Sequence, residues 1–258
     1  MMYTKGANNA THVYIAQDGT NIDTKECVRD LGVTLTCDGS FTTHITNATK
    51  KARSQAGWIL RTFRTRDAIP MLMLYKSLVL PLLEYCCQLW SPWKVGEKQP
   101  LEAVQRSFTS KITIVKHLDY WRRLQTLELF SLERRRERYA IIYIYKIITG
   151  CNTNNINIRT TTHQRLGRLC RVERTHPRAV SRIKTLKENA FATRGPLLFN
   201  ALPRHLRDSN TSSEQFKNKL DKFLWTVPDQ PKLPHYPIRA ISNSIADQLA
   251  LQRADGIF

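Results

Sequence analysis

The chain has 258 residues, of which 41% are hydrophobic, and its 40 Lys and Arg against 21 Asp and Glu give a net charge of +19 at pH 7. The length allows one large domain or two small ones with a buried core, and ten glycines and eleven prolines exclude a low-complexity chain. So large a cationic excess repels itself unless an anionic partner balances it, and nucleic acid is the usual partner. The alternative is a basic protein that is merely soluble or of ribosomal type.

The cysteines and the first residues predict an intracellular protein. None of the six cysteines forms a C-x-x-C pair, and Cys86 and Cys87 lie in an apolar run that favours reduced, buried thiols. Residues 1–19 lack the apolar segment of a signal peptide. No stretch is apolar enough to span a membrane, so no membrane partner is expected.

Residues 1–40 are predicted to be β structure. Residues 12–16 and 21–35 flank Asp18-Gly19, a dipeptide typical of hairpin turns. Residues 27–35 are expected to continue as one strand. A second turn signal, Asp38-Gly39, closes the section.

From residue 42 the pattern becomes helical. Apolar residues at i+3 and i+4 spacing predict one buried face: Ile45, Ala48, Ala52, Ala56, Ile59 and Phe63. At about 100° per residue, Lys50, Arg53, Arg61 and Arg64 fall together on one flank, and Gly57 in the same stripe leaves room for a backbone to come close. No Asp or Glu occurs between residues 42 and 66. A solvated face would mix signs, so the stripe favours phosphate contact.

The centre of the core is predicted in residues 67–91, as a helical hairpin or a kinked helix broken at Pro81. Another helix should begin at Pro100 and run to about residue 114, followed by a short one over residues 120–127. Ser131 suits the N-cap of a long helix that ends at Gly150. That helix begins basic and finishes apolar nearly all round, as a packed helix does.

The last hundred residues are predicted to be less regular. Residues 151–163 should form a loop, 165–187 a basic stretch of short elements, and 189–208 a turn-rich segment containing Gly195-Pro196 and Leu202-Pro203. Residues 214–225 predict a short amphipathic helix. Prolines after Val227 predict an extended tail, with a weak helix over residues 244–254.

Seven segments of the chain, in order, resemble reverse transcriptases of non-LTR retrotransposons of the jockey-like group. The longest is residues 74–93, LYKSLVLPLLEYCCQLWSPW, which is similar to a pattern in the thumb of these enzymes. The others are DLGVTL (30–35), KKAR (50–53), LEAVQR (101–106), the segment 120–136, YKIITG (145–150), and RGPLLFNALP (194–203) followed by FKNKLD (216–221). Phe199 stands where the family usually has Trp, and Ser107 where it has a second Arg.

The resemblance implies a part of a polymerase without its catalytic centre. Reverse transcriptases hold two Mg²⁺ ions with adjacent aspartates in a Y/F-x-D-D turn and a third upstream aspartate. This sequence contains no Asp-Asp pair, so the expected reading is that it begins just after the active site. No catalytic or metal-binding residue is then expected here, and Mg²⁺ only together with the missing palm. The LGV strand borders the primer grip in this family, which makes Leu31, Gly32 and Val33 primer-grip-like.

The expected fold is mainly α, with an N-terminal β-hairpin region, a thumb-like helical bundle and a basic, turn-rich extension. The corresponding segments are residues 1–40, 41–150 and 151–225, with a Pro-rich tail over 226–258. Within the cell, the resemblance implies a nuclear or cytoplasmic ribonucleoprotein.

The expected capacity is sequence-independent binding of RNA and RNA–DNA hybrid through backbone phosphates. The residues predicted to make these contacts are Lys50, Arg53, Arg61, Arg64, Arg106, Lys111, Arg122, Arg123, Arg134, Arg135, Arg136, Arg165, Arg168 and Arg171. The palm and fingers on a separate chain would be a further partner. The alternative is a truncated relic or gene-model fragment with no activity of its own.

Overall fold

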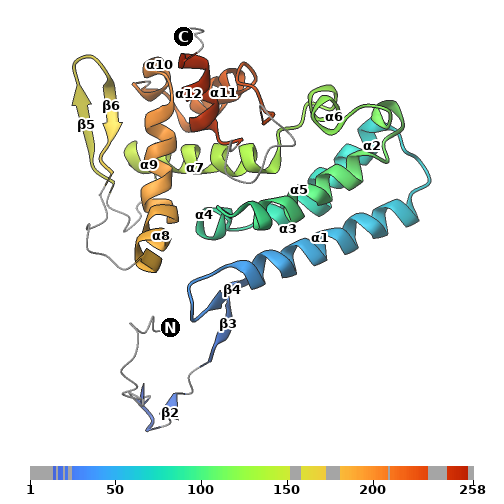
Figure 1. Ribbon diagram of the computed structural model, residues 1–258, viewed down its shortest axis with the longest axis horizontal. Coiled ribbons are helices and arrows are strands. Elements are labelled where there is room, and N and C mark those ends of the chain that lie inside the picture. Colours follow the sequence, from blue (N-terminus) through green and yellow to red (C-terminus); the bar gives the residue numbers. More distant parts are fainter. Residues whose placement is uncertain are drawn as a thin grey trace.

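The computed structural model describes residues 14–15, 17–19, 21–22, 25–151, 158–172, 181–208, 210–231 and 243–254. It is mainly helical, with an antiparallel β-hairpin near the N-terminus, which confirms the predicted fold class (Figure 1). No helix in the described ranges is long and apolar enough to cross a membrane.

Two short hairpins precede the helices. Strands β1 (Tyr14–Ile15) and β2 (Asn21–Ile22) pair around Asp18-Gly19, as predicted. The prediction of one strand over residues 27–35 is wrong, because β3 (Cys27–Asp30) turns back into β4 (Val33–Thr36). Leu31 and Gly32 occupy the turn with φ of 43° and 86°. A two-residue hairpin turn with positive φ at both positions matches the twist of its strands, so the Leu-Gly pair folds the chain here.

Helix α1 (Thr42–Thr62) is the long first helix of the bundle, and its predicted apolar face is buried from Ile45 to Ile59. It packs against α5 (Val95–Thr109) and against the segment that follows α1 in sequence. Helix α5 begins before Pro100, which lies inside it. The helix start predicted at Pro100 is therefore too late.

Pro81 does not break the segment 67–91. Helix α2 (Ala68–Leu74) continues through a π-helical turn, η1 (Tyr75–Val79), into α3 (Leu80–Glu84), with Pro81 in the first turn of α3. Pro81 has no N–H to donate, and the π turn directly before it accommodates that loss. The chain bends instead at Cys86, φ 54°, before α4 (Cys87–Trp90). Cys87 is buried as predicted and Cys86 is exposed.

Ser131 caps the long helix α7 (Leu132–Ile148), and Gly150 turns after it with φ 72°, as predicted. Before it come η2 (Thr113–Val115) and α6 (Tyr120–Thr126). After it come β5 (Thr160–His163), β6 (Gly167–Cys170), α8 (Ser181–Asn189), α9 (Phe191–Ala201), α10 (Arg204–Arg207), α11 (Ser213–Leu224) and α12 (Ile245–Ala254).

The segment predicted as turn-rich, residues 189–208, contains helix α9, which runs through Gly195 and Pro196. Gly195 lies where α9 crosses α7: a Cβ built on it would stand 2.8 Å from Ile144 Cδ1. The glycine thus marks a close helix crossing rather than a turn. The strands β5 and β6 were likewise not predicted.

The hydrophobic core has two clusters that meet where α7 begins. The first runs from Val33 to Leu132 and is built on α1, the segment 68–90, α5 and α6. The second runs from Phe130 to Leu249 and joins α7 to β6, α9, α11 and α12. The core therefore divides near residue 132, and part of the expected tail, at Val227, Ile245 and Leu249, is buried in the second cluster.

Candidate nucleic-acid interface

One flank of α1 is basic and exposed along its length. Lys50, Arg53 and Arg61 are all solvent-exposed, while Ala52, Ala56 and Ile59 on the other side of the helix are buried. Arg64 is exposed too, but it lies after the end of the helix. The structure therefore brings three of the four predicted stripe residues onto one helical flank.

A cleft of about 480 Å³ runs beside this flank, between α1 and the start of α5. Lys50 and Arg53 line it together with Thr46 and Thr49, and Gly96, Glu97 and Pro100 form the opposite wall. The Glu97 carboxylate there accepts a hydrogen bond from the Thr42 hydroxyl at 2.7 Å. The Thr49 hydroxyl is buried and has no hydrogen-bond partner in the described parts of the chain. Phosphate and sugar oxygens of nucleic acids accept hydrogen bonds from hydroxyl and cationic side chains of this kind. Thr46 and Thr49 were missed by the sequence reasoning, although Thr46 lies four residues before Lys50 and Thr49 lies four residues before Arg53.

Gly57 and Arg66 shape the C-terminal half of the stripe. The Arg61 guanidinium lies over Gly57, with Nη1 3.2 Å from the position of a Cβ there. The space expected for an approaching backbone is thus occupied by Arg61 itself. Arg66 donates to the carbonyl oxygen of Leu60 at 2.6 Å and to those of Phe63 and Thr65, so it caps the end of α1.

A second basic group surrounds the Tyr120 ring. Arg106 is exposed, and its guanidinium lies 4.7 Å from the ring centroid, while that of Arg123 lies at 5.8 Å. Arg123 is largely buried, and Arg122 is exposed but 3.3 Å from Asp119. Lys111 is exposed just after α5. Arg106, Lys111 and Arg122 are therefore open to a ligand, and Arg123 supports the stack.

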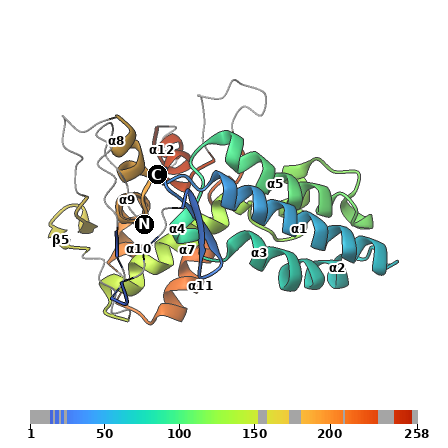
Figure 2. The same ribbon diagram turned by 90° about the horizontal axis from the view of Figure 1, so that it is seen from below.

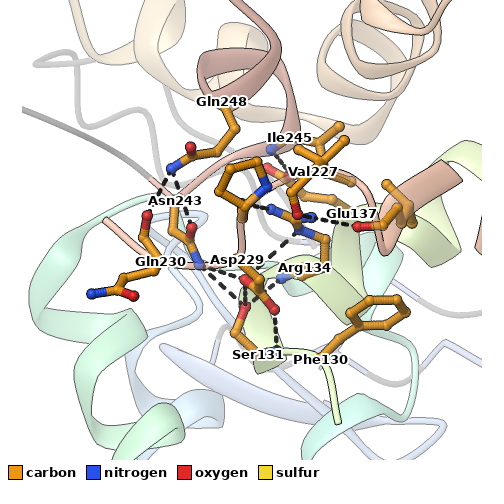
Figure 3. Close-up of polar contacts among 12 residues, drawn as sticks. Phe130, Ser131, Arg134, Glu137, Val227, Asp229, Gln230, Asn243, Ile245 and Gln248 are labelled. Carbon is orange, nitrogen blue, oxygen red and sulfur yellow. Dashed lines mark hydrogen bonds and ion pairs between the residues drawn. The ribbon is translucent and has the colours of Figure 1, made fainter. Parts of the chain in front are cut away.

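Arg134, Arg135 and Arg136 do not lie on the exposed track of backbone-phosphate contacts that the sequence predicts. Arg134 is fully buried and donates to carbonyl oxygens of Leu224, Val227 and Pro228 (Figure 3). Arg135 forms an ion pair with Glu84, and Arg136 is 3% exposed. The first turns of α7 lie between the two core clusters, so these side chains face inward. The consecutive arginines therefore do not form a solvent-exposed basic surface.

The last three predicted contacts, Arg165, Arg168 and Arg171, belong to the β5–β6 hairpin. Arg165 and Arg171 are exposed, and the Arg168 backbone N–H donates to Asp208 Oδ1 at 2.6 Å. Figure 1 and Figure 2 show the hairpin at the opposite end of the molecule from α2. The predicted track is thus not one continuous surface.

The primer-grip-like residues form the tip of the β3–β4 hairpin. Leu31 is 85% exposed, and its carbonyl oxygen accepts a hydrogen bond from the Tyr85 hydroxyl at 2.9 Å. Gly32 lies against the Tyr85 ring, and Val33 is buried in the first core cluster. The hairpin is thereby fixed to the segment 68–90, with one large apolar side chain projecting outward.

The described residues contain no group of three or more His, Cys, Asp or Glu placed to hold a metal ion. No protein-family model, curated protein or solved structure matches the chain.

Proposed function

We propose that this chain is the thumb-containing C-terminal part of a non-LTR retrotransposon reverse transcriptase, and that its own capacity is sequence-independent binding of RNA and RNA–DNA hybrid. The observation that carries the proposal is the exposed flank of α1, with Lys50, Arg53 and Arg61 on one side of a helix that has no acidic residue. The cleft beside it adds the Thr49 hydroxyl, which has no hydrogen-bond partner among the described residues, whereas the Thr46 hydroxyl donates to the Thr42 carbonyl oxygen at 2.9 Å.

The family assignment rests on the seven ordered sequence segments, and the arrangement of elements is compatible with it. Residues 74–93, similar to a thumb pattern, supply Tyr75, Leu83 and Trp90 to the first core, all at most 1% exposed. Because the sequence holds no Asp-Asp pair, the proposal assigns this chain the grip on nucleic acid and not the chemistry. Mg²⁺ and the palm would then come from elsewhere.

The test is a salt titration of RNA binding to the intact chain. Neutralising a phosphate changes the slope of log K against log salt by roughly 0.7 for single strands and 0.9 for duplexes. The variant Lys50→Glu, Arg53→Glu, Arg61→Glu, Arg64→Glu should therefore bind more weakly and lose about 3–4 units of slope. Its circular dichroism spectrum and melting temperature should stay close to those of the wild type, because all four side chains are exposed.

A matched control separates a located site from overall charge. Lys184, Lys187, Lys219 and Lys222 are exposed on α8 and α11, and their replacement by Glu changes the net charge equally. This control should keep most of the salt slope. Equal losses in both variants, or no RNA binding by the wild type at 50 mM salt, would refute the α1 site.

A primer-extension assay addresses the missing chemistry. The chain alone, with Mg²⁺, template RNA and a DNA primer, should extend no primer. Detectable extension that survives repurification would show that the metal-binding residues lie within these 258 residues after all.

A further inference from the structure

A pocket of about 320 Å³ lies in the second half of the molecule, apart from α1. It is enclosed by α7, α9, the first turn of α12 and the segment from Ser91 to Trp93. Its volume is at the lower end of the range of small-molecule sites, about 300–1,000 Å³. The function proposed above does not use it.

Arg136 is a buried cation that lines this pocket. The residue is 3% exposed and lines the pocket, yet Nη1 and Nη2 have no hydrogen-bond partner among the described residues. A guanidinium carries five N–H donors and stays charged, and a buried charge is normally paired. Among the described residues, the Arg136 fork is thus a buried cation with two unpaired Nη groups.

A second guanidinium lines the same pocket. Arg194 donates from Nη1 to the carbonyl oxygen of Ser91 at 3.2 Å, and its Nε has no described partner. Burial lowers the pKa of Arg194, and the charge of Arg136 lowers it further, whereas the charge of Glu137 raises it. Two like charges therefore share a poorly hydrated space, where an anion between them would lower their repulsion.

The N-terminus of α12 adds a third source of positive potential. Ser244, Ala246 and Asp247 line the pocket at the first turn of this ten-residue helix. The first backbone N–H groups of a helix have no partner within the helix and attract anions. One of them, at Ile245, donates to Glu137 Oε2 at 2.6 Å (Figure 3).

Three carboxylates also line the pocket. Glu133 is bound to Lys98 Nζ at 2.5 Å, and Asp247 is exposed. Glu137 accepts a hydrogen bond from the Ile245 N–H of α12. Burial raises the pKa of Glu137 to about 7, and the nearby charge of Glu133 adds to this. Among the described residues, no ion pair joins these carboxylates to Arg136: Glu133 pairs with Lys98 and Glu137 accepts from the Ile245 N–H.

We propose that this pocket binds a phosphate-class oxyanion through Arg136 and Arg194 at the N-terminus of α12. Arg136 supplies the bidentate fork, and Arg194 and the helix supply further donors. The anion belongs either to a small phosphorylated molecule or to the terminal phosphate of a nucleic acid, which share this chemistry.

Sulfate is the first probe, because its charge is constant between pH 6 and 8. At matched ionic strength, sulfate should raise the melting temperature of the intact chain by a few degrees more than chloride does. Arg136→Met should keep only the part of this difference that sulfate gives as an excluded salt, whereas Arg159→Met, at an exposed arginine before β5, should keep all of it. An equal sulfate shift in Arg136→Met, or no difference between sulfate and chloride in the wild type, overturns the proposal.

Glu137→Gln supplies a test of opposite sign, which remains decisive if Arg136→Met does not fold. Gln keeps an acceptor for the Ile245 N–H and removes a negative charge from the pocket. At pH 8 the variant should bind sulfate about tenfold tighter than the wild type, and at pH 6, where Glu137 is protonated, the gap should close. Unchanged affinity at pH 8 would contradict the site.

Two further ligands distinguish the sources of the anion. A 5′-phosphorylated oligonucleotide and the same strand with a 5′-hydroxyl are compared in wild type and in Arg136→Met. A preference for the phosphorylated strand that Arg136→Met loses assigns the pocket to a nucleic-acid end. Competition by inorganic phosphate without that preference assigns it to a small molecule.

Discussion

Arg134 and Asp229 form an ion pair across the second core, with Nε 3.7 Å from Oδ1 (Figure 3). Arg134 is fully buried at the start of α7, and Asp229 lies beyond α11. Asp229 also accepts from the Ser131 backbone N–H and hydroxyl and from Asn243 Nδ2, each at 2.7 Å. This one carboxylate therefore ties the start of α7 to the segment that leads into α12.

Removing Asp229 should strongly destabilise the protein. Asp229→Ala leaves the Arg134 guanidinium buried without its counter-ion, a change that costs about 3–5 kcal/mol. Denaturant unfolding followed by circular dichroism measures the loss. Glu188→Ala, at an exposed position of α8, is the control and should change stability by no more than about 0.5 kcal/mol. A loss for Asp229→Ala as small as that of the control would show that the ion pair is not needed.

The stability should also fall as the pH rises towards neutrality. Burial raises the pKa of Glu102 from 4.5 to about 7, and the pKa of Glu137 likewise. The folded state therefore keeps protons that the unfolded state has lost, and this stabilisation disappears as the pH increases from about 4.5 to about 7. Each group contributes on the order of 1–3 kcal/mol.

The measurement is the free energy of unfolding at pH 5 and pH 8. Glu102→Gln should reduce the drop, because Gln still accepts from Leu132 N–H, which Glu102 binds at 3.1 Å, and does not ionise. Glu188→Gln should leave the drop unchanged. A wild-type stability that rises over this interval would contradict the assigned direction.

How far the sequence predicts the structure depends on the range of the deciding interaction. The apolar face of α1, at i+3 and i+4 spacing, and the Ser131 cap of α7 are local signals, and both predictions are confirmed. Gly195-Pro196 has a strong local turn signal but lies within a helix, because packing against Ile144 decides its conformation. Such a contact between distant residues leaves no trace in the local pattern.

The residues of the candidate site likewise differ in whether local spacing or distant contacts determine their position. Charge spacing identified Lys50 and Arg53 on an open flank, because neighbouring turns of one helix determine their position. The same reasoning overestimated Arg134 and Arg135, whose guanidinium groups pair with Asp229 and Glu84 from distant parts of the chain. The pairing of Arg136 with Arg194 in one pocket arises only from the crossing of α7 and α9.

The crossing of α7 and α9 should not tolerate a side chain at Gly195. Gly195→Ala places a methyl group 2.8 Å from Ile144 Cδ1 and 3.2 Å from Phe191 Cε2, inside a packed core. Overpacking of this kind costs about 1–3 kcal/mol. The control is Gly96→Ala in α5, where no atom lies within 4 Å and alanine should raise stability by about 0.5–1 kcal/mol.

A second substitution tests the cause of the Gly195 effect. Ile144→Val removes the clashing Cδ1, so its cost should be smaller in the Gly195→Ala background than in the wild type. The coupling free energy from a double-mutant cycle by chemical denaturation should be at least about 0.5 kcal/mol. Strict additivity would place the strain elsewhere in the crossing.

The exposed face of α2 should govern self-association of the chain. Ile69 is 77% exposed and Met73 is 67% exposed, one helical turn apart. Within a polymerase a further domain could cover this apolar pair, whereas in a chain studied alone it faces water and favours contact between copies. Ile69→Lys with Met73→Glu should shift sedimentation towards monomer without lowering the melting temperature, because neither side chain contributes to the core.

The double substitution Leu89→Lys with Leu197→Glu, at exposed leucines on α4 and α9, controls for general surface polarity. Equal effects of both pairs would show that no particular face drives association. Persistent aggregation of both variants would favour the alternative that the chain is a relic without a stable fold of its own.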